Sequence, residues 1–255
     1  FRRVLFRSRV VSMGEGQDYA SIAAQKNGKV IYEYDLIDQI WEDRPVLSEE
    51  PVFALNLKYT GETVASKLSR IREEMKKAGA TAHVLTTLDD ICWTLNIRGN
   101  DIEFFPLVLS YAVITMDKVD LYINEAKLNS EIKADLEKDG VVLHPYNDIY
   151  EDIKKTASDE VLLIDPARLN YALYNNIPEG VAKVEERNPE ILFKAIKNEV
   201  EIENIRKAQI KDSVAHVKFM KWLKENVGKM TITEISASDK LDEFRAEQGK
   251  DRKST

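Results

Sequence analysis

Between residues 60 and 175, amphipathic stretches of helix length alternate with short apolar runs of strand length. The helical pattern is clearest over residues 60–79, where apolar side chains recur every three or four positions and a glycine is placed to end the helix. The positions concerned are Val64, Leu68, Ile71, Met75 and Gly79. Two apolar runs, residues 106–115 and 119–124, flank Met-Asp-Lys and predict an antiparallel hairpin. Strands alternating with helices, plus one hairpin, predict an α/β domain with a mixed β-sheet flanked by helices over residues 52–190.

The other elements of this domain are predicted from the same two patterns. Further strands are expected at residues 82–88, 141–146 and 161–165. Further helices are expected at residues 89–95, 127–138, 149–155 and 167–175.

The chain before residue 52 is too short to form a domain by itself. Residues 28–34 predict a strand, and residues 35–41 predict a short helix capped by Asp35. Residues 44–51 contain two prolines and are typical of a linker. Residues 9–50 are therefore expected to be the C-terminal remnant of a first domain.

The chain changes character near residue 191. No proline or glycine interrupts residues 198–227, which predict a long helix, and Thr231 with Glu234 fits a capping box opening a second one. The apolar residues expected on one face of the long helix are Ile205, Ala208, Ala215, Phe219, Trp222 and Leu223. Because two helices without a sheet cannot bury such a face, residues 191–250 are expected to be the start of a truncated third domain.

The two ends of the chain are related in an unusual way. One choice of codons for FRRVLFRS, residues 1–8, has a reverse complement that encodes Asp-Arg-Lys-Ser-Thr when read one base in, and residues 251–255 are DRKST. Both ends are therefore expected to be tails derived from one sequencing-adapter segment, and we exclude them from fold reasoning.

Composition limits the classes of function. The net charge of -7 gives no basic excess to neutralise phosphates, which argues against nucleic acid as a partner. No apolar run approaches the roughly 18 residues of a membrane helix, and no secretion signal opens the chain. A cytoplasmic protein is the expectation. Cys92, the only cysteine, has apolar neighbours and is expected to be a buried, inert thiol.

No complete catalytic constellation is visible. The three histidines, His83, His144 and His216, fall in different elements without metal-binding spacing. The first two are expected to be packed or at a sheet edge, and His216 is expected to be exposed or to face the missing domain. Asp89 and Asp90 are a possible chelating pair, but their place before an apolar run favours a helix N-terminus.

Residues 95–101, LNIRGND, place Arg98, Asn100 and Asp101 around Gly99 between two apolar runs. Two interpretations stay open at this point. The segment is either a turn closed by an Arg98–Asp101 pair, or a loop that reaches beyond its own domain through charge-assisted hydrogen bonds.

Five blocks of the sequence, in order, resemble the aminopeptidase P group of the creatinase–prolidase superfamily. DLIDQIWEDRP (35–45) is similar to the end of its first domain, and VFALNLKYTGETVASKLSRIRE (52–73) and LDDICWTLNIRGNDI (88–102) are similar to its second. Residues 192–223 resemble the helix that opens its catalytic domain, and TEISASDKLDEFR (233–245) resembles the continuation of that domain. The blocks span nearly all of residues 30–250.

The resemblance implies a three-domain metallo-aminopeptidase that removes the N-terminal residue from peptides with proline second. It implies a creatinase N-terminal-like domain over residues 52–190 and the first helices of a truncated pita-bread catalytic domain. That catalytic domain holds two divalent metal ions, commonly manganese, between two aspartates, a histidine and two glutamates. Those ligands lie downstream of Lys250 in the family, so the resemblance assigns no catalytic or metal residue here and implies an inactive fragment. A homodimer is implied for the parent protein.

In the family the loop at residues 95–101 lies near the catalytic cleft. The resemblance therefore implies that Arg98, Asn100 and Asp101 shape the substrate entrance or lock the domain against its neighbour. One departure is Phe104-Phe105 before Pro106, where the family usually has Tyr-Asn, so polar contacts made by that pair in relatives are not carried over.

Two other functions stay open. Creatinase-like folds also serve as non-catalytic peptide- or protein-binding modules, and the presence or absence of the five downstream ligands would discriminate between them. A prolidase that cleaves only dipeptides fits the first-domain remnant and the KAIKNE block (194–199) less well.

Overall fold

The computed structural model describes residues 3–5, 8–32, 37 and 40–249. The chain divides into two compact units, one formed by residues 1–55 and 62–196 and the other by residues 56–61 and 197–255. Each is described by itself below.

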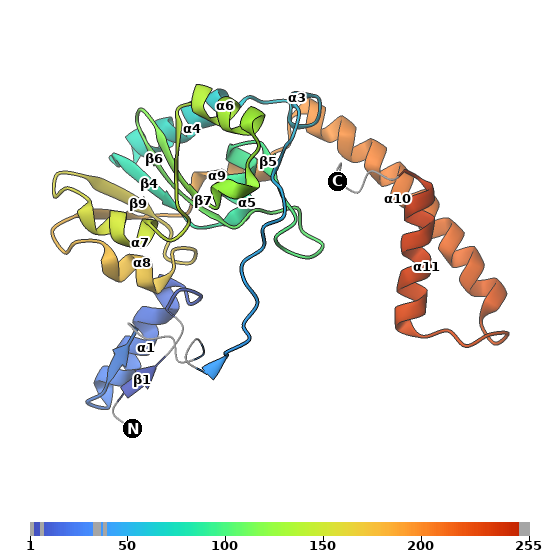
Figure 1. Ribbon diagram of the computed structural model, residues 1–255, viewed down its shortest axis with the longest axis horizontal. Coiled ribbons are helices and arrows are strands. Elements are labelled where there is room, and N and C mark those ends of the chain that lie inside the picture. Colours follow the sequence, from blue (N-terminus) through green and yellow to red (C-terminus); the bar gives the residue numbers. More distant parts are fainter. Residues whose placement is uncertain (1–2, 6–7, 33–36, 38–39, 250–255) are drawn as a thin grey trace. The chain divides into compact units, whose positions relative to one another are not determined.

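The first unit is built on a six-stranded mixed sheet with strand order β10-β9-β4-β6-β7-β8 (Figure 1). The strands are β4 (Ala82–Leu85), β6 (Ser110–Thr115), β7 (Val119–Ile123), β8 (Val141–His144), β9 (Val161–Ile164) and β10 (Ala182–Glu185). The pairs β4–β6 and β6–β7 are antiparallel, and the other three pairs are parallel. The predicted fold class is confirmed, and the predicted hairpin is β6–β7. A separate two-stranded ladder pairs β3 (Phe53–Ala54) with β5 (Ile97–Arg98).

Helices cover both faces of this sheet. One face packs against α4 (Val64–Lys77), α5 (Leu88–Thr94) and α6 (Ser130–Lys138), and the other against α1 (Met13–Gln25), α7 (Ile149–Asp152) and α8 (Tyr171–Asn176). The 3-10 turns η1 (Glu125–Lys127) and η2 (Ile153–Lys155) and the helix α9 (Pro189–Ala195) complete the unit. Two apolar clusters, one on each face, form its core.

The helix predicted over residues 60–79 begins later than expected. All four predicted core positions of α4 are buried, and Gly79 follows it at φ 71°. Thr60, however, ends a separate short helix, and Gly61 breaks the chain at φ 66°. A Cβ at Gly61 would lie 2.5 Å from the Asn198 side chain, so only glycine fits this turn.

Several other boundaries differ for local reasons. The helices predicted from residues 127 and 167 begin instead at Ser130 and Tyr171, where Asn129 and Asn170 accept hydrogen bonds as N-caps. Helices α1 and α9 and strand β10 have no counterpart among the predicted elements.

The part before residue 52 holds a second small sheet. β1 (Arg3–Leu5) pairs in parallel with β2 (Lys29–Ile31), within the predicted strand 28–34. Most of the predicted helix 35–41, including Asp35, lies outside the described residues, as do the predicted tail at 251–255 and much of the one at 1–8.

The second unit contains α3 (Leu57–Thr60), α10 (Glu199–Asn226) and α11 (Glu234–Glu247). The expectation of one helix over residues 192–223 is wrong, because α9 ends at Ala195 and α10 starts at Glu199, where Asn198 and Glu201 form a capping box. The predicted Thr231–Glu234 cap is also wrong, since Thr233 and Ser236 make that box.

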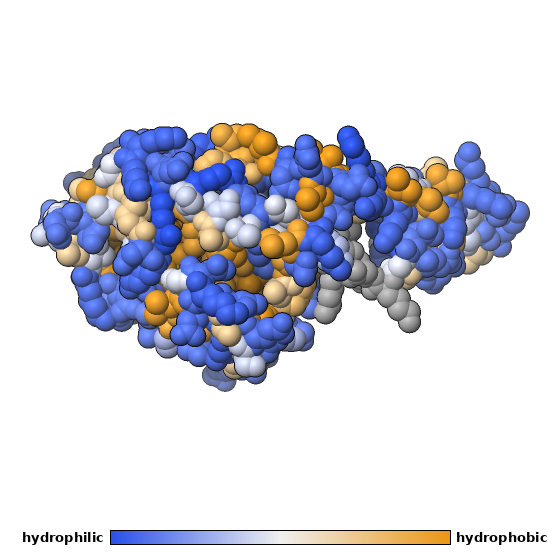
Figure 2. Space-filling view, turned by 90° about the horizontal axis from the view of Figure 1, so that it is seen from above, coloured by the Kyte–Doolittle hydropathy of each residue, from blue (hydrophilic) through white to orange (hydrophobic). Residues whose placement is uncertain are grey.

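Only part of the apolar face predicted for α10 is buried. Ala215 is buried, but Ile205 is 49% exposed, and several apolar side chains of α10 lie in solvent. Orange patches of this kind interrupt the polar surface of the helical pair in Figure 2.

Candidate functional site

A buried lysine of α4 fixes the start of the loop at residues 95–101. Lys67 is 1% exposed, and its ammonium donates to the Trp93 carbonyl and to the Asn96 side chain, both at 2.7 Å. It also lies 4.3 Å from the Trp93 ring centre. Asn96 has φ 53°, a left-handed conformation that asparagine tolerates, and its amide donates to the Glu62 carbonyl. The start of the loop is therefore fixed within its own unit.

A second buried lysine holds the end of the loop. Lys127 pairs with Asp101, and the two side chains are 1% and 0% exposed. The same Asp101 oxygen accepts a hydrogen bond from the Leu109 backbone at 2.7 Å. Among the described residues, the other carboxylate oxygen, Oδ1, has no hydrogen-bond partner. The carboxylate thus points inward and organises the chain before β6.

The other two predicted site residues differ in their surroundings. Arg98 donates to the carbonyls of Cys92 and Ile97 at 2.7 and 2.8 Å, whereas Asn100 is exposed. Between them, Gly99 packs so tightly that a Cβ would lie 2.8 Å from Val108. The loop is a rigid support, and Asn100 is the most exposed of the three predicted residues.

The chain that follows Asp101 carries two exposed aromatic rings. Phe104 is 85% exposed and has φ 67°, which is rare for a bulky residue, and Phe105 is 63% exposed. The sequence singled these residues out only by their departure from the family pattern. Large apolar side chains on a strained, exposed turn are typical of a contact surface.

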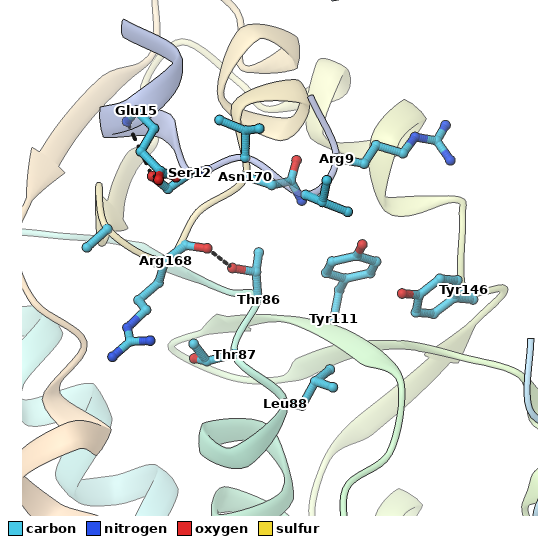
Figure 3. A pocket seen from close by; sticks show the side chains of 13 residues that line it. Arg9, Ser12, Glu15, Thr86, Thr87, Leu88, Tyr111, Tyr146, Arg168 and Asn170 are labelled. Carbon is cyan, nitrogen blue, oxygen red and sulfur yellow. Dashed lines mark hydrogen bonds between the residues drawn. The ribbon is translucent and has the colours of Figure 1, made fainter. Parts of the chain in front are cut away.

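A cavity of about 320 Å³ lies beyond the carboxyl ends of β4 and β9 (Figure 3). It is lined by Arg9, Val10, Val11, Ser12, Glu15, Thr86, Thr87, Leu88, Tyr111, Tyr146, Ala167, Arg168 and Asn170. This edge of an α/β sheet is where ligands commonly bind. No pattern in the sequence predicted the cavity, because its wall joins segments separated by more than 130 residues.

Many of the polar side chains that line the cavity already contact other residues of its wall. Ser12 and Glu15 form the capping box of α1, and this contact lowers the pKa of Glu15. Thr86 donates to the Arg168 carbonyl at 2.7 Å, and the Tyr111 and Tyr146 rings stack at 5.0 Å. Burial raises the pKa of Tyr111, so its phenol stays protonated. The cavity therefore offers few uncommitted groups for a ligand.

The histidines occupy the kinds of place that were predicted. His83 is fully buried on β4, inside the sheet, and His144 is on the edge strand β8, 2.8 Å from Asp120. His216 is exposed on α10. None of the three is placed with a group of metal-binding side chains among the described residues.

Asp89 and Asp90 lie in the first turn of α5, as expected for a helix N-terminus. The sequence did not predict which side chain pairs with them. Asp89 and Asp90 both pair with Lys194 of α9, and Asp90 is buried. Cys92 is buried as predicted, and burial raises the pKa of its thiol to about 11. A thiol that stays protonated at neutral pH is a poor nucleophile.

The described residues contain neither a cluster of metal ligands nor a membrane-spanning helix. No group of three or more His, Cys, Asp or Glu side chains is arranged to hold a metal ion. No helix among them has the length and apolar character to span a membrane.

Comparisons with known proteins identify relatives of nearly the whole chain. A probable Xaa-Pro aminopeptidase P of Neurospora crassa is 37% identical over 226 residues, covering 84% of this chain and 33% of the relative. Xaa-Pro aminopeptidase 1 of Dictyostelium discoideum is 37% identical over 256 residues, covering 94% and 40%. The chain thus spans 33% to 40% of the length of these relatives.

A solved structure agrees with the sequence matches. The X-prolyl aminopeptidase of Caenorhabditis elegans, described as a cytosolic enzyme with a di-nuclear active site, superposes with a TM-score of 0.88. It is 32% identical, and the match covers 96% of this chain and 41% of that structure. Residues 43–201 match the creatinase/prolidase N-terminal domain family, and the chain belongs to that family.

Proposed function

We propose that this chain is part of a metal-dependent Xaa-Pro aminopeptidase, which releases the N-terminal residue from peptides with proline second. The observation that carries the proposal is similarity to Xaa-Pro aminopeptidases along 94% of the chain in sequence and 96% in structure. The chain supplies the non-catalytic second domain and the first helices of the catalytic domain, over residues 191–250.

The metal centre belongs to another part of the parent protein in this proposal. The described residues bring no set of metal ligands together, so they do not fit a metal site, and we derive no catalytic step from them. The relative's di-nuclear active site supports two divalent ions in the parent, and we propose manganese. We also propose a cytoplasmic location, which the cytosolic relative supports, and a homodimer.

The loop has a supporting role in the proposal. Asn100 and the exposed rings of Phe104 and Phe105 contact the catalytic part near the substrate entrance. Two buried lysines, Lys67 and Lys127, hold the base of the loop rigid, so its tip is presented at a fixed position. Arg98 and Asp101 act indirectly, by fixing the backbone.

The test is to extend the coding sequence beyond Lys250 in the source DNA. The proposal predicts a continuous frame that encodes two aspartates, a histidine and two glutamates at the family's metal-binding positions. A frame that continues into a similar fold without those ligands would contradict the enzyme and support a peptide- or protein-binding module.

A variant pair tests the role of the loop in the complete gene product. Phe104→Ser should raise the KM for an Xaa-Pro peptide or weaken the association of the domains, while leaving the unfolding of this domain almost unchanged. Ile22→Ser on α1, another exposed apolar residue, is the matched control. Equal behaviour of the two variants would contradict the docking role.

A further inference from the structure

Helix α9 is attached to the first unit in an unusual way. Of its seven residues, all of which are described, Glu190 alone is buried. Leu192 is 61% exposed, and Phe193 is only partly buried. Surface helices normally dock through an apolar stripe. Here the group that enters the protein interior is a carboxylate.

The Glu190 carboxylate meets the imidazole of His83, and both side chains are 0% exposed. His83 Nδ1 lies 3.0 Å from the Leu163 carbonyl, which only accepts hydrogen bonds, so Nδ1 carries a proton. His83 Nε2 lies 3.2 Å from Glu190 Oε2. That second contact also requires one proton, held either by Nε2 or by the carboxyl group. The pair therefore shares one proton inside the protein.

The groups around this pair favour keeping the proton. From α5, Asp90 is buried and Asp89 lies beside it, while Asp165 follows β9. The cations nearby are Lys194 of α9, paired with both α5 carboxylates, Arg168 near Asp89, and Arg70 of α4, 4.4 Å from the Phe193 ring centre. Burial lowers the pKa of His83, but Glu190, the Leu163 carbonyl and Asp90 together raise it above its ordinary value.

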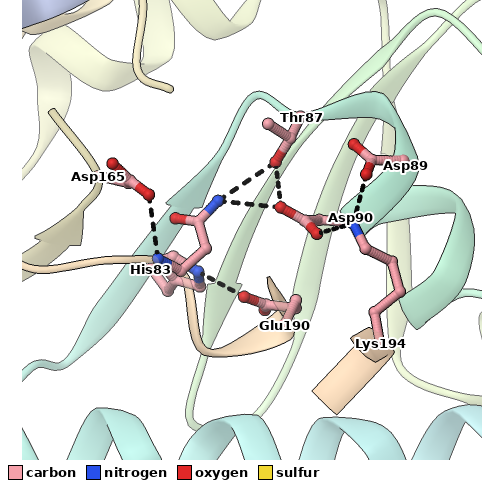
Figure 4. Close-up of polar contacts among 8 residues, drawn as sticks. His83, Thr87, Asp89, Asp90, Asp165, Glu190 and Lys194 are labelled. Carbon is pink, nitrogen blue, oxygen red and sulfur yellow. Dashed lines mark hydrogen bonds and ion pairs between the residues drawn. The ribbon is translucent and has the colours of Figure 1, made fainter. Parts of the chain in front are cut away.

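Apart from Phe193, which packs against the apolar core cluster, the other contacts of α9 described here are polar as well (Figure 4). The Asn188 backbone donates to Asp165 at 3.2 Å, and its side chain donates to Thr87 and Asp90. Lys194 donates to Asp90 at 2.6 Å. These bonds surround the His83–Glu190 contact, so a charge left inside the cluster would act on all of them.

We propose that the His83–Glu190 pair is a proton-controlled latch, in which the shared proton holds α9 on the sheet and its loss at alkaline pH releases the helix. Glu190 Oε1 already has no hydrogen-bond partner among the described residues. Without the shared proton, Oε2 loses its bond to His83 too, and a charged carboxylate stays buried next to Asp90. Because residue 197 begins the longer segment of the second unit, the latch controls the last helix before that segment.

Hydrogen–deuterium exchange of the chain between about pH 6 and pH 9 tests the latch, with rates corrected for intrinsic exchange. Protection of α9 should fall about tenfold for each unit by which folding raises the pKa of His83, while β6 and β7 stay unchanged. In His83→Gln this pH dependence should vanish. In His144→Gln, which removes a partly exposed histidine that also faces a carboxylate, it should remain.

Protection of α9 that does not change with pH in the wild-type chain would overturn the latch, as would loss of the dependence in His144→Gln. A second readout covers the case in which His83→Gln fails to fold. In the wild-type chain, nitrogen-15 NMR should show His83 protonated on Nδ1 at every pH, with the Nε2 signal changing at the pH at which α9 loses protection. A neutral His83 with its proton on Nε2 would also overturn the proposal.

Discussion

Helices α4 and α9 both contact the sheet unit, but different forces hold them. α4 buries the apolar side chains Val64, Leu68, Ile71 and Met75 together with Lys67, whereas α9 buries Glu190 alone. The attachment of α4 rests mainly on apolar area removed from water, which does not depend on protonation, and Lys67 adds hydrogen bonds to Trp93 and Asn96. The attachment of α9 rests mainly on hydrogen bonds and paired charges, with Phe193 alone packed against the apolar core cluster of this face. Two helices of one domain can therefore differ in their response to pH because different kinds of contact attach them.

The largest effect is expected where a charge pair is fully buried. Asp101→Ala leaves the Lys127 ammonium buried without its partner, which should lower the free energy of unfolding by about 3–5 kcal/mol. Urea denaturation measures the change. Glu103→Ala, in the same loop but exposed, should change it by less than about 0.5 kcal/mol. Equal losses in the two variants would contradict the inward role of Asp101.

Ile71→Ala tests whether apolar burial attaches α4 to the sheet. It removes a fully buried side chain from α4 and should cost about 2–5 kcal/mol. The loss should be the same near pH 6 and pH 9, and Lys76→Ala on the exposed face of α4 is the control. A loss that changes with pH would show that α4 and α9 do not differ as described.

The pH dependence of the free energy of unfolding tests the contribution of the His83–Glu190 pair. The folded-state pKa of His83 is raised, so its contribution is complete below about pH 6.5 and is lost as pH rises through the folded-state pKa. The loss should be about 1.4 kcal/mol for each unit of that shift, measured by denaturation at a series of pH values. His83→Gln should remove this component. A component that survives in the variant must come from another group.

Lys194→Met should lower the free energy of unfolding the least. Its ammonium is partly exposed, and Asp90 keeps its bonds to Thr87 and Asn188. We expect a loss of about 1 kcal/mol or less, which shrinks as salt is added. Lys154→Met, which breaks an exposed pair within one helix turn, provides the baseline. A loss of several kcal/mol would mean that Lys194, rather than the shared proton, holds α9.

The same difference explains which parts of the fold could be predicted. Helix α4 and the β6–β7 hairpin follow from apolar periodicity, which the sequence displays directly. Helix α9 has no apolar stripe, and only Asn188-Pro189, a cap followed by a proline at the first helical position, signals where it starts. Its partners His83 and Asp90 lie about one hundred residues away, where spacing carries no information.

The candidate loop shows a similar limit. Its composition suggested that Arg98, Asn100 and Asp101 matter, but it could not identify the buried lysines that hold the loop, 26 and 29 residues away. The exposure of Phe104 and Phe105 also depends on the turn that follows Asp101. Sequence therefore located the loop, and the structure separates its rigid base from its exposed tip.

The most direct test of the account is an assay of the complete gene product on a peptide with proline second. We expect hydrolysis that releases the first residue, that a chelator abolishes and that manganese restores, while a matched peptide with alanine second is cleaved far more slowly. The 255-residue chain assayed in parallel should be inactive. Metal-dependent turnover by that chain alone, or no turnover by the complete product, would contradict the account.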